Sequence, residues 1–193
     1  MSKFKILKAT MSVFLIMSVG FLYGCGGGGG GTPKKPEAKT NQVIECRYTT
    51  ENAPMLDGVA DDAIWQNIQP VNILLESYYT FDMKTAYDDE NIYFAFICYE
   101  KDMTSVRASI SDRDRMYSDD WVGPFINTYG DLKQGFETYV NPKGIQGDLL
   151  WSTNNEDSNF DIIYESEAKM YSDKWTAEMK IPFKSLRFPD KDE

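Results

Sequence analysis

The chain has 193 residues, of which 42% are hydrophobic and 14% aromatic, enough for the core of one domain. Its formal charge of −10 argues against binding to nucleic acid or to anionic lipid, because both need clusters of Lys and Arg. The chain has no histidine, which removes the commonest general base, the nucleophile systems that depend on histidine and nearly all zinc chemistry.

Residues 1–24 have the pattern of an export signal. Lys3, Lys5 and Lys8 precede an apolar run, which is followed by small residues. The stretch "LYGC", which ends at Cys25, resembles a bacterial lipobox, so cleavage is expected before Cys25 and lipidation on it. Several acyl chains would anchor the protein stably. The alternative is an ordinary cleaved signal with an incidental cysteine. Loss of the three lysines would bring the net charge to about −13.

Residues 25–41 form a Gly-, Pro- and Lys-rich stretch without apolar anchors, which predicts a flexible tether. No Asp follows Cys25, so an exported protein lipid-anchored in the outer membrane is expected rather than one retained at the inner membrane. The sequence leaves the membrane face open.

Two further cysteines, Cys46 and Cys98, lie in apolar, strand-like runs. An exported chain could oxidise them to a disulfide, or each could serve as a small buried hydrophobe.

Residues 42–193 are predicted to form one domain in which a period of two dominates. Side chains of residues 164–170 alternate between apolar and charged, and residues 175–181 repeat the pattern with Thr176, Glu178 and Lys180 on the polar face. Such alternation indicates half-buried antiparallel strands with one wet face. Residues 91–99, "NIYFAFICY", are apolar on both faces and predict a central strand.

Turn residues divide these strands into three expected hairpins. They join residues 84–87 to 91–99, residues 122–128 to 136–141, and residues 164–171 to 175–182. Only residues 60–67 and 183–188 have the pattern of short helices. Many short strands with polar turns predict an all-β, antiparallel β-sandwich.

Four segments in order resemble a known family. They are "LDGVADDAIW" (56–65), "AYDDENIYFAF" (86–96), "DDWVGPFINT" (119–128) and "WTAEMKIPFKSL" (175–186). Together they look like the β-sandwich of carbohydrate-binding module family 9. "GFETYVNPKGIQGD" (135–148) resembles the version that precedes a large outer-membrane β-barrel in exported Gram-negative proteins.

The resemblance implies carbohydrate binding without catalysis, in which two aromatic rings clamp a glycan end and polar side chains read its hydroxyls. With Asp120 as the anchor of the alignment, the first clamp position falls at Tyr117. The family's carboxylate falls at Gly123 and its cationic residue at Glu137, so this chain departs from the pattern at both. The expected glycan-binding residues are Tyr117, Asp120, Glu137 and Trp151.

The second clamp tryptophan of the family lies beyond the segment that ends near Pro189, and this sequence stops at Glu193. We therefore expect the sandwich to lack at least its last strand, and a barrel or enzyme domain to follow in a longer protein. Otherwise the site is completed in another way.

The four tryptophans have different expected roles. Trp175 and Trp65 lie in apolar patterns typical of core packing, whereas Trp151 follows a less regular, polar stretch and is the best surface aromatic for a ligand. For Trp121 the sequence leaves an exposed position and a covered one equally open.

Acidic pairs precede several elements, where Asp commonly acts as a cap or turn former. The functional alternative is structural calcium, for which Asp102 and Asp119 are the candidate ligands. Adjacent strand residues point to opposite faces, so Asp119 and Asp120 are a poor pair for glycoside hydrolysis. Together with the resemblance, this implies a non-catalytic module linked to polysaccharide capture or breakdown. The alternative is an envelope module that kept the fold and docks a partner protein or barrel.

Overall fold

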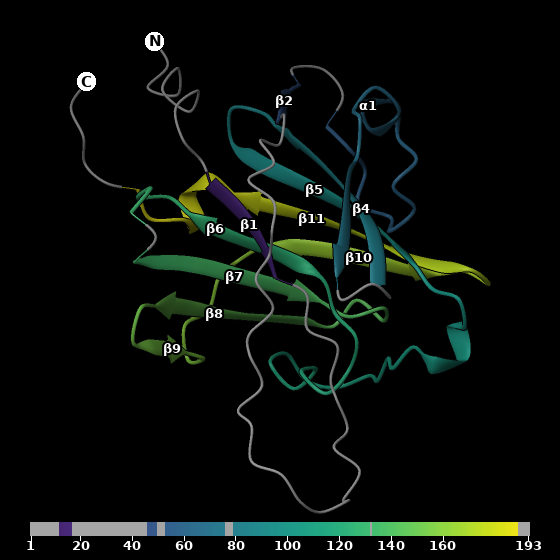
Figure 1. The fold of residues 1–193 in the computed structure, drawn as a ribbon. Helices are drawn as coiled ribbons and strands as arrows, with labels where there is room; N and C mark the ends of the chain where they lie inside the picture. Colours follow the sequence, from purple (N-terminus) through teal and green to yellow (C-terminus); the bar gives the residue numbers. More distant parts are fainter. Residues whose placement is uncertain (1–11, 17–45, 50–52, 76–78, 132, 189–193) are drawn as a thin grey trace, which may run out of the picture.

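The computed structural model describes residues 12–16, 46–49, 53–75, 79–131 and 133–188, and these form two packed β-sheets (Figure 1). One sheet has the order β1-β6-β7-β8-β9 and the other the order β10-β11-β5-β4-β2, with β3 also paired to β4. Every pairing is antiparallel except the two-residue ladder between β2 and β4. The prediction of an all-β sandwich is confirmed.

The strands of the first sheet are β1 (Ser12–Ile16), β6 (Gly123–Asn127), β7 (Gln134–Val140), β8 (Gln146–Ser152) and β9 (Asn155–Asp157). Those of the second are β2 (Arg47–Tyr48), β3 (Val71–Leu75), β4 (Tyr79–Tyr87), β5 (Asn91–Tyr99), β10 (Glu165–Met170) and β11 (Lys174–Pro182).

The helical elements are short: α1 (Ala63–Gln66) and the 3₁₀ turns η2 (Met103–Ser105) and η3 (Phe183–Ser185). Both predicted helical segments are therefore present, each as about one turn. Among the described residues, no helix is long and apolar enough to cross a membrane.

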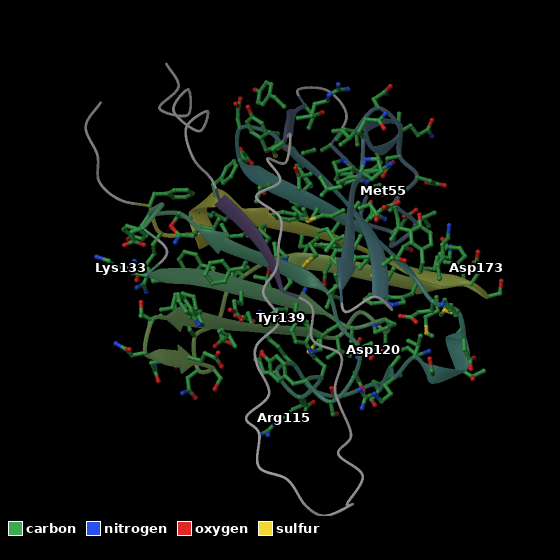
Figure 2. The ribbon with its side chains drawn as sticks, in the orientation of Figure 1. Met55, Arg115, Asp120, Lys133, Tyr139 and Asp173 are labelled. Atoms are coloured by element: carbon green, nitrogen blue, oxygen red, sulfur yellow. The ribbon has the colours of Figure 1, made fainter. Side chains whose placement is uncertain are left out.

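All three predicted hairpins are confirmed, as the β4–β5, β6–β7 and β10–β11 pairs. In Figure 2, Lys133 marks the β6–β7 turn at one end of the sandwich and Asp173 marks the β10–β11 turn at the other. β5 lies between β11 and β4, as its two apolar faces predict.

The core lies between the sheets and is built from the inward-facing residues of the central strands. Phe94, Phe96 and Trp175 are fully buried there against Ile126 and Phe136 of the opposite sheet. Trp175 has 0% of its surface exposed, which confirms its predicted core role.

A second apolar layer covers the outer side of the six-stranded sheet. The segment 53–68 places Ile64, Trp65 and Ile68 over Tyr93 and Ala95. Trp65 is 1% exposed, as its predicted core role requires. This layer overturns the expectation that β11 has one wet face, because it covers Thr176 and Glu178, which are both 1% exposed.

Glu178 fixes this layer through its carboxylate. One oxygen accepts a hydrogen bond from the Trp65 Nε1–H at 2.7 Å, and the other accepts from the N–H groups of Gly58 at 3.0 Å and Asp57 at 3.3 Å. Gly58 has a φ of +74°, and a Cβ there would lie 2.8 Å from the Ala168 backbone. The N–H donors of the segment 53–68 thus take the place of the hydrogen bonds that water would make to the buried carboxylate.

The two cysteines of the described chain are free, so the disulfide alternative is wrong. Cys98 pairs with Phe81 on β4, whereas Cys46 precedes Arg47, which pairs with Ala86. In this parallel ladder Cys46 lies level with Thr85, and the four residues from there to Phe81 along β4 span about 13 Å, well beyond the reach of a disulfide. Burial raises the pKa of both thiols and keeps them protonated, as expected of small buried hydrophobes.

We expect Glu178→Gln to lower the free energy of unfolding by about 1–3 kcal/mol at pH 7, because the amide NH₂ would face an N–H donor. Burial raises the pKa of Glu178 above its ordinary value of 4.5, while the Trp65 and Asp57 donors oppose the shift. The folded state therefore binds the proton more tightly than the unfolded chain does. This contribution to stability is complete below pH 4.5 and is lost as the pH rises through the folded-state pKa.

Urea unfolding of both proteins between about pH 4 and pH 8 measures the effect. The difference between wild type and Glu178→Gln should narrow as the pH rises, since only the wild type loses this contribution. Parallel stability curves over the whole range would contradict the assignment.

Candidate functional site

The connection between β5 and β6, residues 100–122, leads from one sheet to the other and carries most of the candidate residues. Asp120 closes part of it: its N–H donates to the Arg107 carbonyl at 2.9 Å and its carboxylate accepts from the Arg107 N–H at 3.2 Å. The Arg107 guanidinium lies 4.0 Å from the same carboxylate. Burial raises the pKa of Asp120, and these contacts with Arg107 oppose the shift.

Asp119 fastens the same connection to the β7–β8 turn. Its carboxylate accepts hydrogen bonds from the Ser109 N–H at 2.8 Å, the Ser109 hydroxyl at 2.9 Å and the Asn141 side-chain amide at 2.8 Å. The Asn141 amide also donates to the Ser109 carbonyl, and its oxygen accepts from the N–H groups of Lys143 and Ile145. Asp119 and Asn141 therefore hold two loops in one fixed arrangement.

Asp102 caps the 3₁₀ turn η2. Its carboxylate accepts from the Thr104 N–H at 2.9 Å and from the Thr104 hydroxyl at 2.6 Å. These bonds lower the pKa of Asp102, with the hydroxyl contact as the largest cause. The roles of Asp102 and Asp119 in the structure are those of a cap and a loop anchor.

Within the described residues, a different set of acids is close enough to share an ion: Asp114, Asp148 and Asp161. The Arg113 guanidinium lies among them, bonded to Asp148 and 3.8 Å and 4.0 Å from the carboxylates of Asp114 and Asp161. A positive charge from the chain itself therefore offsets part of the negative charge of this acidic group.

Arg113 and Asp148 form the centre of a network at the edge of the sandwich. Arg113 also donates to the Gln146 side chain and the Ile162 carbonyl, and its guanidinium lies over the Tyr164 ring at 5.1 Å. Burial raises the pKa of Asp148, whose side chain is fully covered, while the Ile162 N–H and Arg113 oppose the shift. The network ties the connection to β8 and to the start of β10.

We call the face of the five-stranded sheet that is turned away from the core the outer face. Strand alternation assigns residues to it, because Ile126, Phe136 and Leu150 belong to the core. Their neighbours Phe125, Glu137 and Leu149, which pair across β6, β7 and β8, therefore lie on the outer face. The aromatic side chains of this face form two groups.

The first group consists of Tyr117, Trp121 and Tyr139. The Trp121 and Tyr139 rings lie 4.2 Å apart between centroids, and Tyr117 meets Tyr139 edge-on at 6.2 Å. Trp121 is 5% exposed, and its Nε1–H has no hydrogen-bond partner among the described residues. Figure 2 shows the connection that carries Arg115 passing below Tyr139 in that view.

Tyr117 is held from beneath by β8. Its hydroxyl lies 3.3 Å from the Asp148 carbonyl and 3.5 Å from the Asp114 carboxylate. A Cβ at Gly147 would lie 3.1 Å from this hydroxyl, so glycine gives the ring its room. Burial raises the pKa of Tyr117, and the charges of Asp114, Asp148 and Glu137 add to the shift.

The second group consists of Phe125 and Trp151. Their rings meet edge-on at 5.6 Å, and the Phe125 ring lies over Gly135, where a Cβ would overlap with it. Trp151 pairs with Gly135 across β7 and β8 and is half-buried. Glycine on the middle strand thus leaves space for two rings side by side.

Glu137 stands between the two groups. It accepts a hydrogen bond from the Tyr139 hydroxyl, and burial together with the Glu137 charge raises the pKa of Tyr139. The outer face therefore carries aromatic rings at both sides of a carboxylate, a chemistry suited to stacking and to accepting hydroxyl hydrogen bonds. Phe125, Glu137 and Tyr139 are buried there, whereas Tyr117 and Trp151 are half-buried.

The structure brings three of the four expected binding residues, Tyr117, Glu137 and Trp151, to one face. Asp120 does not join them, because its carboxylate is bonded to Arg107 inside the connection. Tyr139 was not among the binding residues expected from the sequence. For Trp121 the sequence did not decide between an exposed and a covered position. Tyr139 lies two residues after Glu137 on one strand, a spacing that places both on the same face and could have pointed to it.

Gly123, which falls at the position of the family's carboxylate in the resemblance, is closely packed in this structure. A Cβ built there would overlap with the Thr138 carbonyl oxygen, which leaves no room for any side chain. The position that carries a carboxylate in the family is here a point where β6 and β7 approach closely.

Comparison with solved structures supports the fold assignment. A family 9 carbohydrate-binding module from Caldicellulosiruptor kristjanssonii in complex with cellotriose matches with a TM-score of 0.51 and 20% identity, over 72% of this chain and 67% of that one. The module in complex with glucose matches with a TM-score of 0.51 and 19% identity, over 77% and 71%. The fold is like that of carbohydrate-binding module family 9.

A protein from Bacteroides uniformis, provisionally described as carbohydrate-binding, matches with a TM-score of 0.54 and 17% identity, over 72% of each chain. No family model and no curated protein matches the chain. At these identities the likeness concerns the fold.

Structural calcium at Asp102 and Asp119 stays a prediction. If either carboxylate exchanges a hydrogen-bond partner for the ion, added calcium should raise the melting temperature and excess EDTA should lower it. Thermal unfolding followed by circular dichroism measures this, with magnesium as the control cation. Identical curves in calcium and EDTA would contradict the prediction.

Proposed function

We propose that the chain is a non-catalytic carbohydrate-binding domain that holds a glycan on the outer face of β6–β8. The main observation behind the proposal is that five aromatic residues lie around Glu137 on that single face: Tyr117, Trp121, Tyr139, Phe125 and Trp151. The likeness to a module seen with cellotriose and with glucose supports the proposal.

The chemistry of a pyranose fits this face. Its C–H face stacks on an aromatic ring, while its equatorial hydroxyls seek acceptors and donors at the ring's edge. Glu137 supplies an acceptor, and the Trp121 Nε1–H supplies a buried donor that no described group satisfies. Buried donors are normally paired, so a ligand hydroxyl is a fitting partner for it.

The carboxylates of this region support binding rather than hydrolysis. A glycosidase needs two carboxylates about 5–10 Å apart across the sugar. Glu137 is bonded to Tyr139 and Asp120 to Arg107. Asp119 accepts its hydrogen bonds from the two loops that it joins. Asp119 and Asp120 are thus engaged in holding the protein's own structure, which leaves Glu137 without a catalytic partner between them.

Binding to an affinity gel that contains a soluble β-glucan tests the proposal. Trp151→Ala and Tyr117→Ala should each raise the dissociation constant about tenfold, or roughly 1.4 kcal/mol, because each removes a stacking surface. Tyr99→Ala is the matched control, since Tyr99 is exposed on the other sheet. Tyr117→Trp should strengthen binding through the larger ring.

The gels should include neutral, acidic and amino-sugar polymers, so that an unsuitable choice of glycan is not taken for a failure. No binding to any of them by a folded protein, or equal losses in Tyr99→Ala and Trp151→Ala, would overturn the proposal.

We also propose that this domain is exported and anchored by lipid at Cys25, with residues 25–41 as its tether. The apolar leader with its "LYGC" ending and the tether composition support this. An outer-membrane location and a role in polysaccharide capture or breakdown belong to the same proposal.

Cys25→Ser tests the anchor. Wild-type protein expressed in a Gram-negative host should incorporate labelled palmitate and fractionate with membranes. The variant should lose both properties while Cys46→Ser retains them. Palmitate incorporation that survives Cys25→Ser would contradict the assignment.

A further inference from the structure

The Trp121 indole carries a buried polar group that the protein does not satisfy. The residue is 5% exposed, and its Nε1–H meets no acceptor in the part of the chain that the structure describes. A donor that loses water on folding and gains no partner costs free energy, so such groups are rare in folded proteins. One hydrogen-bond donor is therefore available beside the Tyr139 ring, whose centroid lies 4.2 Å from that of Trp121.

The side chains around this donor are mostly apolar. Six of them form one cluster, which we call the Trp121 cluster: Met116, Tyr117, Trp121, Tyr139, Ile145 and Leu149. Tyr117, Ile145 and Leu149 are half-buried, so the cluster reaches the surface through these three side chains, its rim. A ligand group that fits this place must offer an acceptor to the indole and an apolar part to the rim.

A neutral carbonyl suits the indole better than a hydroxyl or a carboxylate does. A hydroxyl can accept from the indole, but it brings its own O–H donor into the same apolar surroundings, and that donor needs an acceptor in turn. A carboxylate brings no donor, but it carries a negative charge. Burial raises the pKa of Tyr117, and the charges of three carboxylates add to the shift: Asp114, Asp148 and Glu137. A further anion beside them is unfavourable, because like charges repel.

We propose that the outer face selects glycans that contain 2-acetamido sugars, with the acetamido carbonyl accepting from the Trp121 Nε1–H and the methyl group packing against the rim. This assignment rests on the proposed glycan-binding function and names the class of sugar bound there. The carbonyl is an acceptor without charge or donor, and the methyl supplies the apolar part. The amide N–H points away from the carbonyl, so it stays toward water.

The half-buried Tyr117 ring is the side chain that can admit this group. Its hydroxyl lies 3.3 Å from the Asp148 carbonyl and 3.5 Å from the Asp114 carboxylate, and contacts of this length hold it weakly. Changes of side-chain rotamer are common where a partner binds. A shift of the Tyr117 ring would open a path to the indole N–H and bring the ring against the sugar.

Three trisaccharides with the same β-1,4 backbone test the proposal, because they differ only at C2: the trimers of N-acetylglucosamine, of glucosamine and of glucose. Isothermal titration calorimetry with the full chain should give the acetylated trimer a dissociation constant about tenfold lower than that of either other trimer, as one hydrogen bond to a buried donor provides.

Equal affinities for the acetylated and glucose trimers would overturn this proposal. So would tighter binding of the glucosamine trimer, because a positive charge would then be the group recognised. Binding to one of the affinity gels without preference for the acetylated trimer overturns the sugar class alone. Absence of binding to every gel overturns the glycan-binding function on which it rests.

Trp121→Phe removes the indole N–H and keeps an aromatic ring. The preference for the acetylated trimer over the glucose trimer should fall from about tenfold to less than about twofold. Trp175→Phe is the matched control: the Trp175 Nε1–H is also buried without a partner among the described residues, but it lies in the core between the sheets. Its preference should equal that of wild type, and urea unfolding checks that both variants fold. An unchanged preference in Trp121→Phe would contradict the assignment.

A measurement on the wild type keeps the proposal testable if Trp121→Phe fails to fold. The Trp121 indole N–H gives its own signal in a proton–nitrogen NMR spectrum, and this signal should shift downfield when the acetylated trimer binds, because the N–H gains an acceptor. The Trp65 indole already donates to Glu178, so its signal should stay in place. A Trp121 signal that does not move while the acetylated trimer is bound would overturn the proposal.

Discussion

The side-chain amide of Asn141 holds together the two pieces of chain from which the outer face is built. It donates to Asp119 and to the Ser109 carbonyl on the β5–β6 connection, and it accepts from two N–H groups of the β7–β8 turn. Asn141 is fully buried, so none of these bonds competes with water. The hydrogen bonds of the Asn141 side chain therefore help to fix the positions of Tyr117 and Trp121 relative to Tyr139.

The buried carboxylates Asp148, Asp120 and Glu178 each have partners within the protein. The chain is strongly acidic, yet Arg113 is engaged by Asp148, and Arg107 by Asp120, where each supports a loop. Glu178 is satisfied by the Trp65 indole and backbone N–H groups rather than by a cation. The buried carboxylates therefore hold loops in place. This explains why acids that look functional in the sequence have a structural role.

The fold could be predicted from sequence because period-two alternation and turn residues are local signals. The three hairpins, the central strand and the buried Trp175 all follow from such patterns. The buried Thr176 and Glu178 could not be foreseen, because the layer that covers them comes from residues more than 100 positions earlier. Alternation tells which residues share a face; it does not tell what packs on that face.

The candidate residues were predicted on two different grounds. The family resemblance supplied the positions of Tyr117 and Glu137, and Trp151 was chosen as an aromatic residue in a less regular, polar stretch. The contact of Asp120 with Arg107 could not be predicted, since it depends on a long irregular connection whose path no periodicity records. Trp121 stayed open for the same reason, at the point where that connection becomes a strand.

The close approach at Gly123 has a consequence for how this domain can change over time. Because the Thr138 oxygen occupies the space of a Cβ, no single substitution can give the position a carboxylate while β6 and β7 keep their spacing. A carboxylate at this position would need the two strands to separate first. Substitutions that would add a polar side chain to this part of the sheet are therefore restricted to other positions.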